Sequence, residues 1–206
     1  MVDTSPFTAF RFIQVDGSVS ILSSEMAAIV RRISFFSCGV KNVTTDLKEK
    51  LTPILGRIPS GVFILVASDG ESRKTGLLAS WIQQASFEPP QVTVAVNKSR
   101  YLIDWLKAGS AVTLNQVQKG DNTLFKHFGK GFEPDSAAFE GVDTVIGDNG
   151  LPLLRAAMTS LEGTVAGCME AGDHVIFLVT LTNSIAHRDI ADFDPFVHIR
   201  KNGFSY

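Results

Sequence analysis

The chain has 206 residues, a formal net charge of -2 at pH 7 and a hydrophobic content of 45%. This length predicts one domain of ordinary size, and the hydrophobic content is too high for a disordered chain. The near-neutral charge argues against a dedicated nucleic-acid-binding protein, and no apolar run approaches the ~18 residues that a membrane span needs.

Residues that could form disulfides or bind metals are few and scattered. Cys38 and Cys168 lie far apart and in no CxxC spacing, which favours a reducing cytosol over a disulfide scaffold. The four histidines form no cluster: His127, His174, His187 and His198. We therefore predict a cytoplasmic protein with no metal site.

The first 45 residues differ in pattern from the rest of the chain. The stretch "FRFIQVDGSVSIL" at 10–22 predicts a hairpin with Asp16-Gly17 as its turn, and Met26 is an alternative start. We expect residues 1–45 to be an N-terminal extension of unknown role and residues 46–206 to form the functional domain.

The stretch "TDLKEKLTPILGRIPSG" predicts a short amphipathic helix with Thr45 as its N-cap and Pro59 and Gly61 at its end. Four apolar residues share one face of this helix: Leu47, Leu51, Ile54 and Leu55. The pattern then changes to short strands separated by turn residues: 61–68, 75–80, 82–88 and 91–96.

Two more helices are expected, at 99–109 between Ser99 and Gly109 and at 121–131, where Asp121 caps the helix and Gly129 ends it. A strand at 110–117 separates these helices, and a turn-rich segment covers 129–155. Strands return at 159–169, 173–187 and 196–200. Many short strands and few short helices predict a closed or nearly closed antiparallel barrel.

A strand-to-helix junction is the first candidate for chemistry. Asn97, Lys98, Ser99 and Arg100 lie where the strand at 91–96 would meet the helix at 99–109. Free backbone N–H groups at a helix start, together with cations and a hydroxyl, suit a phosphate group. The alternative is an ordinary helix cap with solvated basic residues.

A neutral, partly polar wall is the second candidate. No residue between Lys74 and Glu88 is charged, yet Ser80 and Ser86 interrupt the apolar pattern. Such a wall suits a flat ring with a polar edge, and flavin mononucleotide (FMN) has this shape and a terminal phosphate. The alternative is simple alternation on a barrel strand. His174 follows the turn Gly172-Asp173 and is either a surface residue or a donor to a ligand.

These residues carry a resemblance to a known family. From about Leu47 to Tyr206 the chain resembles the flavin reductase-like, FMN-binding split-barrel family, through "TGLLASWIQQASFEPPQVTVAVNKSR", "HFGKGF", "SLEGTVAGCMEAGDHVIFL" and "HIRKNGFSY". It is most similar to the C-terminal flavin reductase module of cyanobacterial and plastid flavodiiron proteins. The resemblance implies a mainly β, Greek-key split β-barrel with a few short helices, normally a homodimer.

The resemblance also implies roles for particular residues. His174 would meet the reduced nicotinamide, and the other implied residues would hold FMN: Leu77, Leu78, Ala79, Ser80, Ser86, Asn97, Lys98, Ser99, Arg100 and Phe128. Phe128 would be a loop contact, and Asn97, Lys98 and Ser99 would serve the ribityl-phosphate end. The chain departs from the family at Leu78, where threonine is common, and at Trp81, where a small residue is common.

The implied reaction is hydride transfer from NADH or NADPH to flavin. It needs no acid–base pair from the protein. The alternative is an electron-transfer module that holds FMN for an electron-accepting protein partner without efficient NAD(P)H use. A third alternative is a split-barrel protein that has lost flavin and acts only in interaction.

Overall fold

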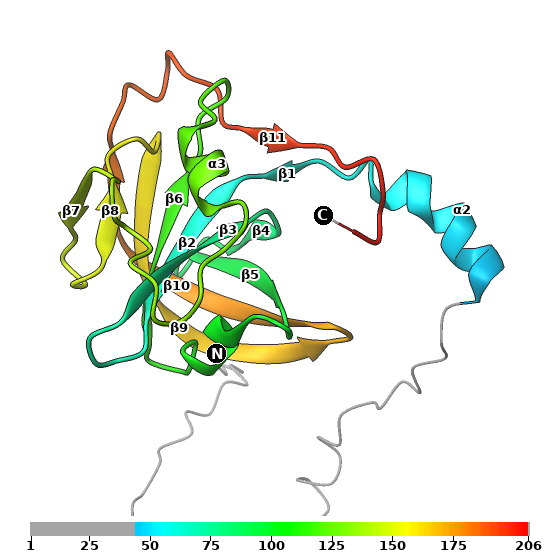
Figure 1. Cartoon of the computed structure of the whole chain (residues 1–206), viewed down its shortest axis with the longest axis horizontal. Coiled ribbons are helices and arrows are strands. Elements are labelled where there is room, and N and C mark those ends of the chain that lie inside the picture. The colour runs from blue at the N-terminus through cyan, green and yellow to red at the C-terminus, as the bar shows by residue number, and fades with distance from the viewer. Residues whose placement is uncertain (1–43, 206) are drawn as a thin grey trace, which may run out of the picture. The chain divides into compact units, whose positions relative to one another are not determined.

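The computed structural model describes residues 44–205. The hairpin predicted at 10–22, the alternative start at Met26, Cys38 and almost all of the predicted extension lie outside the described residues. Figure 1 shows the helices and strands of the chain with their labels.

Helix α2 spans Thr45–Leu55, close to the prediction, but its cap and its end differ from it. Thr44, not Thr45, is the N-cap, and its side chain accepts a hydrogen bond from the Leu47 backbone N–H. The C-cap is Gly56, ahead of the predicted Pro59, because the Gly56 backbone lies against the C-terminal tail. No α2 residue is buried among the described residues, so the predicted apolar face is largely exposed.

Strands are the commonest elements of the described chain, as expected, and most of them are short. Their bounds are β1 (Ser60–Gly61), β2 (Phe63–Ser68), β3 (Lys74–Ala79), β4 (Ile82–Ser86), β5 (Gln91–Asn97), β6 (Ala111–Gln116), β7 (Thr144–Ile146), β8 (Pro152–Leu154), β9 (Thr159–Ala171), β10 (His174–Ala186) and β11 (Val197–His198).

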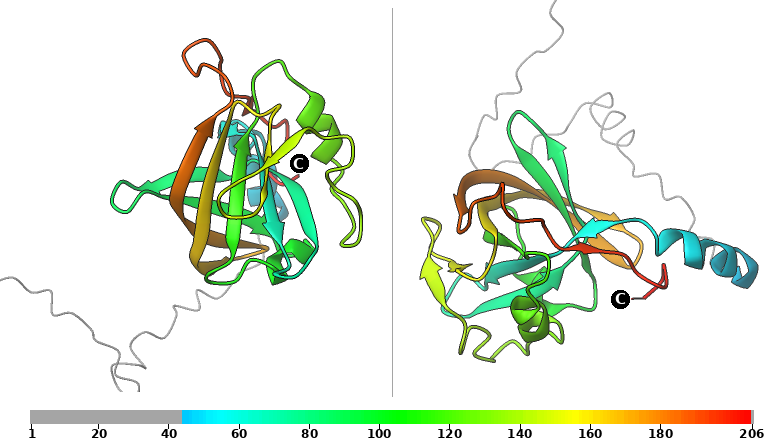
Figure 2. Two further views of the ribbon diagram at one scale, coloured as in Figure 1. Left: turned by 90° about the vertical axis from the view of Figure 1, so that its left-hand side faces the viewer. Right: turned by 90° about the horizontal axis from the view of Figure 1, so that it is seen from above.

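Seven of these strands form one antiparallel sheet in the order β3-β2-β6-β9-β10-β5-β4. The sheet curls, and β3 comes to lie near β5 (Figure 2). β1 pairs with β11 and β7 pairs with β8 in two small ladders. The prediction of a Greek-key split β-barrel with few helices is confirmed.

The barrel interior is filled by side chains that alternate along the strands. In β5, Val92, Val94 and Val96 point into the main hydrophobic cluster, while the residues between them face outward. β2 is buried on both faces, with Leu65 in the main cluster and Ile64 in a second cluster beneath α3. This double burial explains why its sequence is a continuous apolar run.

Helix α3 (Thr123–Phe128) confirms the helix predicted at 121–131. Asp121 Oδ1 accepts a hydrogen bond from the Thr123 N–H at 2.8 Å, although Asn122 is the residue that directly precedes the helix. In the turn-rich segment that follows, β7 and β8 pair as a hairpin.

The predicted helix at 99–109 is wrong. Only a 3₁₀ turn, η1 (Tyr101–Asp104), forms there, and Ser99 donates its N–H to Asn97 Oδ1 at 2.9 Å instead of capping a helix. The Gly109 N–H, which would extend a helix, bonds to the Val165 carbonyl at 2.8 Å. Pairing with β9 and burial of Leu102 therefore override the local helical pattern.

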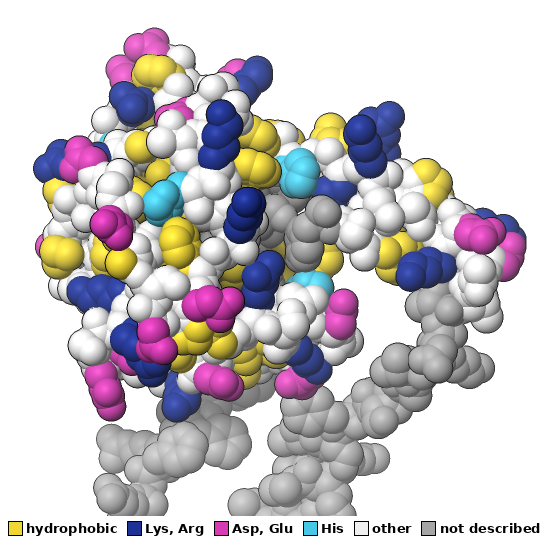
Figure 3. Space-filling view, viewed as in Figure 1, with side chains coloured by type: hydrophobic (Ala, Val, Ile, Leu, Met, Phe, Trp, Pro, Cys, Tyr) yellow, Lys and Arg dark blue, Asp and Glu magenta, His cyan; other side chains and the backbone are white. Residues whose placement is uncertain are grey.

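Positive and negative side chains alternate over the face shown in Figure 3, without a large patch of one sign. This mixture agrees with the small net charge of the sequence. Within residues 44–205 no helix is long and apolar enough to cross a bilayer.

Candidate functional site

A cavity of about 270 Å³ lies between β3, the end of β5, and α3. Many of its lining residues come from the two sequence stretches singled out above. Seven predicted cofactor-binding residues line it: Leu77, Leu78, Ala79, Ser80, Asn97, Arg100 and Phe128. The fold therefore brings the neutral wall and the junction after β5 to one place.

Close packing of α3 on β3 builds the floor of the cavity. Phe128 is fully buried at the last position of α3, so it is a helical residue and not the loop contact that the resemblance implied. A Cβ added to Gly76 would lie only 2.4 Å from Phe128 Cε1. Glycine at position 76 is thus what lets the aromatic ring reach the sheet.

A second chamber of about 240 Å³ adjoins the first and shares Leu77, Arg100 and Gly131 with it. The residues that line this chamber alone include three with hydroxyl groups, one cation and one carboxylate: Thr75, Gly76, Ser99, Tyr101, Leu102, Lys130, Phe132 and Glu133. Neither chamber reaches the roughly 300 Å³ at the lower end of small-molecule sites, but the pair does.

Arg100 stands where the two chambers meet. Its Nη1 atom lies 3.2 Å from the position that a Cβ on Gly131 would occupy. Gly131 also has φ of +75°, a conformation that other residues rarely adopt. The positive φ favours glycine at position 131, and the missing Cβ leaves room for the Arg100 guanidinium against the backbone of the loop after α3.

Two predicted cofactor residues line neither chamber. Lys98 forms an ion pair with Glu170, and its backbone N–H donates to the Asp173 carbonyl at 2.9 Å. Ser86 pairs with Gln91 at the opposite end of β5 from Asn97. At about 3.3 Å per residue this separation is roughly 20 Å.

His174 lies beside the cavity but does not line it. It begins β10 opposite Asn97, and its side chain is 7% exposed. The Trp81 ring covers it at a centroid distance of 4.6 Å. Its Nδ1 lies 2.8 Å from Asp173 Oδ1, and this hydrogen bond lowers the pKa of the Asp173 carboxyl.

Ser160 and His187 resemble a nucleophile and its base but are not arranged as one. Ser160 Oγ lies 2.8 Å from His187 Nε2, and it donates to Asn115 Oδ1 at 2.6 Å. Because the single hydroxyl hydrogen goes to Asn115, the imidazole donates to Ser160 and cannot deprotonate it. Ser160 is also fully buried, so the trio holds strands together.

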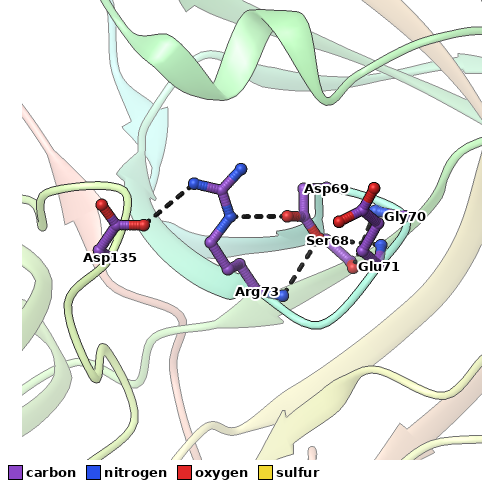
Figure 4. Close-up of polar contacts among 6 residues, drawn as sticks. All are labelled: Ser68, Asp69, Gly70, Glu71, Arg73 and Asp135. Atoms are coloured by element: carbon purple, nitrogen blue, oxygen red, sulfur yellow. Dashed lines mark hydrogen bonds and ion pairs between the residues drawn. The ribbon is translucent and has the colours of Figure 1, made fainter.

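The loop after α3, which walls both chambers, is tied down at its far side (Figure 4). Arg73 Nη1 bonds to Asp135 Oδ1 at 3.0 Å, and Arg73 Nε bonds to Asp69 Oδ2 at 2.7 Å. The bond to Arg73 lowers the pKa of the Asp69 carboxyl. These contacts link the loop to the turn between β2 and β3.

Sequence reasoning missed several residues of the site. Lys130 and Tyr101 line the second chamber and His198 lines the first. The pattern Gly-Lys-Gly at 129–131 was a usable signal for Lys130, because glycines let a backbone approach a ligand. No local pattern marks His198, which reaches the cavity through the pairing of β11 with β1.

Other candidate sites on the described chain are weaker. A larger, shallow hollow of about 780 Å³ near the start of α3 is lined by polar and charged residues and glycine, so it has no apolar wall for a ring. Within residues 44–205 no group of three or more His, Cys, Asp or Glu is arranged to hold a metal ion.

The sequence of this chain is similar to known proteins of one family. Residues 55–205 match the family model described as "Flavin reductase like domain". Diflavin flavoprotein A 1 of Synechocystis sp. is 39% identical over 168 residues, which cover 81% of this chain and 28% of that protein. Putative diflavin flavoprotein A 1 of Thermosynechococcus vestitus is 34% identical over 168 residues, with the same 81% and 28% coverage. The chain spans about a quarter of the length of these curated relatives.

Solved structures agree with this relationship. The NADH:FAD oxidoreductase SgcE6 of Streptomyces globisporus superposes with a TM-score of 0.64 at 25% identity, over 73% of this chain and 86% of that one. The flavin reductase HpaC, at 21% identity, shares the fold with a TM-score of 0.61 over 72% of this chain and 90% of that one. Since the family model matches most of the sequence, the chain belongs to the flavin reductase-like domain family.

Proposed function

We propose that the chain is a flavin reductase that binds FMN across the two adjoining chambers and accepts hydride from NADH or NADPH. The observation that carries this proposal is the cavity itself, in which apolar walls from β3 and α3 meet polar groups and a guanidinium. Membership of the flavin reductase-like domain family supports the same reaction class.

The residues present fit a flavin. Leu77, Leu78 and Phe128 offer apolar surface for a flat ring, and Ser80 and Asn97 offer hydrogen-bonding groups for its polar edge. The adjoining chamber contains the cations Arg100 and Lys130 and the Ser99 hydroxyl, which suit a phosphate. These cations replace Lys98, whose ammonium pairs with Glu170. We therefore propose that the phosphate is bound by the side chains of Arg100, Lys130 and Ser99, and not by the N-terminus of a helix.

Bound flavin would supply the two-electron acceptor chemistry. The chain's own residues bind it, orient it and exclude water. Fully buried Phe128 and the half-buried leucines of β3 keep solvent from the ring side of the cavity. Arg100 holds the anionic end, which fixes the position of the ring along the cavity. Hydride transfer to flavin needs no acid or base from the protein.

The remaining expectations are part of the same proposal. The solved neighbour named as an NADH:FAD oxidoreductase supports a nicotinamide nucleotide as the reductant. We propose that His174 meets this nucleotide, that the protein is a homodimer, and that it works in the cytoplasm.

The second candidate is an electron-transfer module that holds FMN for an electron-accepting protein partner. The observation that favours it is the cover over His174, whose side chain is 7% exposed beneath Trp81. The curated relatives, of which this chain matches about a quarter, are consistent with a domain that works beside other redox domains.

The visible spectrum of the purified protein, followed by anaerobic addition of NADH and then NADPH, tests the proposal. Absorbance bands at about 370 and 450 nm show bound oxidised flavin. Bleaching by either nucleotide supports the reductase and reveals its preference. A yellow protein that neither nucleotide bleaches supports the electron-transfer module. A colourless protein whose melting temperature does not change when FMN is added contradicts both the reductase and the electron-transfer module.

A further inference from the structure

The C-terminal tail and α2 interlock to form one arm, defined here as residues 45–55 together with 199–204. Gly203 N–H donates to the Thr52 carbonyl at 2.9 Å, and Arg200 N–H donates to the Gly56 carbonyl at 2.9 Å. A Cβ on Gly203 would lie 2.5 Å from Leu55 Cβ and 3.0 Å from the Thr52 carbonyl oxygen. The tail and the helix therefore fit together only through glycine.

The arm is weakly joined to the barrel. The pairing of β1 with β11 is short: Ser60 pairs with His198 and Gly61 with Val197, and the Val62 N–H bonds to the Phe196 carbonyl at 3.0 Å. No residue of α2 is buried among the described residues, and Ile54 is 63% exposed. Segments with little buried apolar surface open locally at low free-energy cost. The arm can thus move without unfolding the barrel, and in Figure 1 α2 and the red tail lie together beside it.

One side chain of the arm reaches back to the site. The Arg200 guanidinium is centred 5.0 Å from the Trp81 ring, and Arg200 is 9% exposed. The Trp81 ring in turn lies 4.6 Å from the His174 ring. A cation over an aromatic face and a ring on an imidazole are both favourable contacts, so the arm holds Trp81 as a cover on His174.

We propose that this arm is a strap that regulates access to His174. In the closed state Arg200 holds Trp81 over His174, and in the open state the arm lifts and His174 is exposed to the nicotinamide nucleotide. The identity of the ligand, a nicotinamide nucleotide, rests on the proposed function. The covering of His174 by Trp81 does not depend on that function. His198, two residues before Arg200, lines the flavin cavity, so β11 links the strap to the cavity wall.

Chemical modification of His174 measures the cover directly. Diethylpyrocarbonate acylates exposed imidazoles, and mass spectrometry of peptides gives a rate for each histidine in the intact chain. Arg200→Ala removes the cation over Trp81. Gly203→Ala unseats the tail from α2 without touching the site. The matched controls are Lys201→Ala, an exposed neighbour, and Gly167→Ala, where an added Cβ meets nothing within 4 Å.

We expect His174 to be modified about tenfold faster in Arg200→Ala and in Gly203→Ala than in the wild type, because the modified form is drawn from the open population. The two controls should match the wild type, and circular dichroism should show that all variants fold. His127, on α3, serves as the internal rate standard.

Equal rates for His174 in the wild type and in both test variants would overturn the strap. A faster rate in either folded variant, with the controls unchanged, supports it. The same variants are then reduced by NADH and NADPH in stopped flow. If His174 is modified faster in the test variants while the rate of flavin reduction is unchanged, the strap is supported. The same result contradicts the role of His174 in the proposed function. The two failures are therefore distinguishable.

Discussion

Replacing Gly76 with alanine tests how the cavity wall is built. The added Cβ would lie 2.4 Å from Cε1 and 2.8 Å from Cδ1 of Phe128, whereas ordinary contacts begin at 3.4 Å. The Phe128 ring must therefore move by about 1 Å in a close-packed interior. It cannot do so freely, because it is fully buried and packs against Phe132 and Phe139 at centroid distances of 5.7 and 6.0 Å.

Overpacking of this kind costs about 1–3 kcal/mol. Alanine is favoured over glycine inside a strand by roughly 0.5–1 kcal/mol, so the net loss for Gly76→Ala should be about 0–2.5 kcal/mol. Gly167→Ala, which also lies in a strand but meets nothing within 4 Å, should be neutral or slightly stabilising. Because Phe128 lines the cavity, the affinity for FMN should fall in Gly76→Ala and stay unchanged in Gly167→Ala.

Urea unfolding of a double-mutant cycle gives the decisive measurement. Phe128→Leu shortens the obstructing side chain, so Gly76→Ala should cost less in that background than in the wild type. A coupling free energy of about 0.5–3 kcal/mol is expected between contacting residues. If the two changes add within about 0.5 kcal/mol, Gly76 and Phe128 do not obstruct one another and the account of the cavity floor is refuted.

The remaining predictions concern charge and protonation. Arg100→Ala should weaken FMN binding by about 1.5–3 kcal/mol in calorimetry, because a charge-assisted phosphate bond is lost, whereas Lys98→Ala should change it by no more than ~0.5 kcal/mol; the reverse order would restore Lys98 as the phosphate ligand. His174→Ala should slow reduction by the nicotinamide nucleotide more than it weakens FMN binding, and equal effects would make His174 a support of the fold. Burial, with nearby Arg155 and Arg188, lowers the pKa of His187 below 6.5. Its neutral form therefore stabilises the fold above pH 6.5, and this stability is lost as the pH falls from there toward the lower folded-state pKa. Urea unfolding between about pH 5 and 8 should show this slope in the wild type and a flatter one in His187→Gln.

Strand positions were predictable because they depend on alternation and on turn residues that lie within a few positions of each other. Val92, Val94 and Val96 alternate with half-buried residues and face the core. The helix predicted at 99–109 failed because the local pattern competes with pairing elsewhere. Gly109 bonds to Val165, a residue far along the chain. No window around residue 109 contains that information.

The sequence by itself determined the class of fold and where the cavity would form. The stretch Leu77 to Ser80 and the end of β5 at Asn97 were identifiable because each set is contiguous in the chain. Only the tertiary structure decided which cations face the cavity. Neighbouring residues after a strand point in different directions, so Arg100 lines the chambers while Lys98 pairs with Glu170.

Only the tertiary structure placed Trp81 between His174 and the C-terminal tail residue Arg200. Trp81, His174 and Arg200 come from three distant parts of the sequence, and they meet because β5 pairs with β10 and the tail folds back along α2. Contacts between distant residues follow from how the whole sheet closes. Local periodicity predicts only which face of a helix or strand is apolar, and it does not predict what packs against that face.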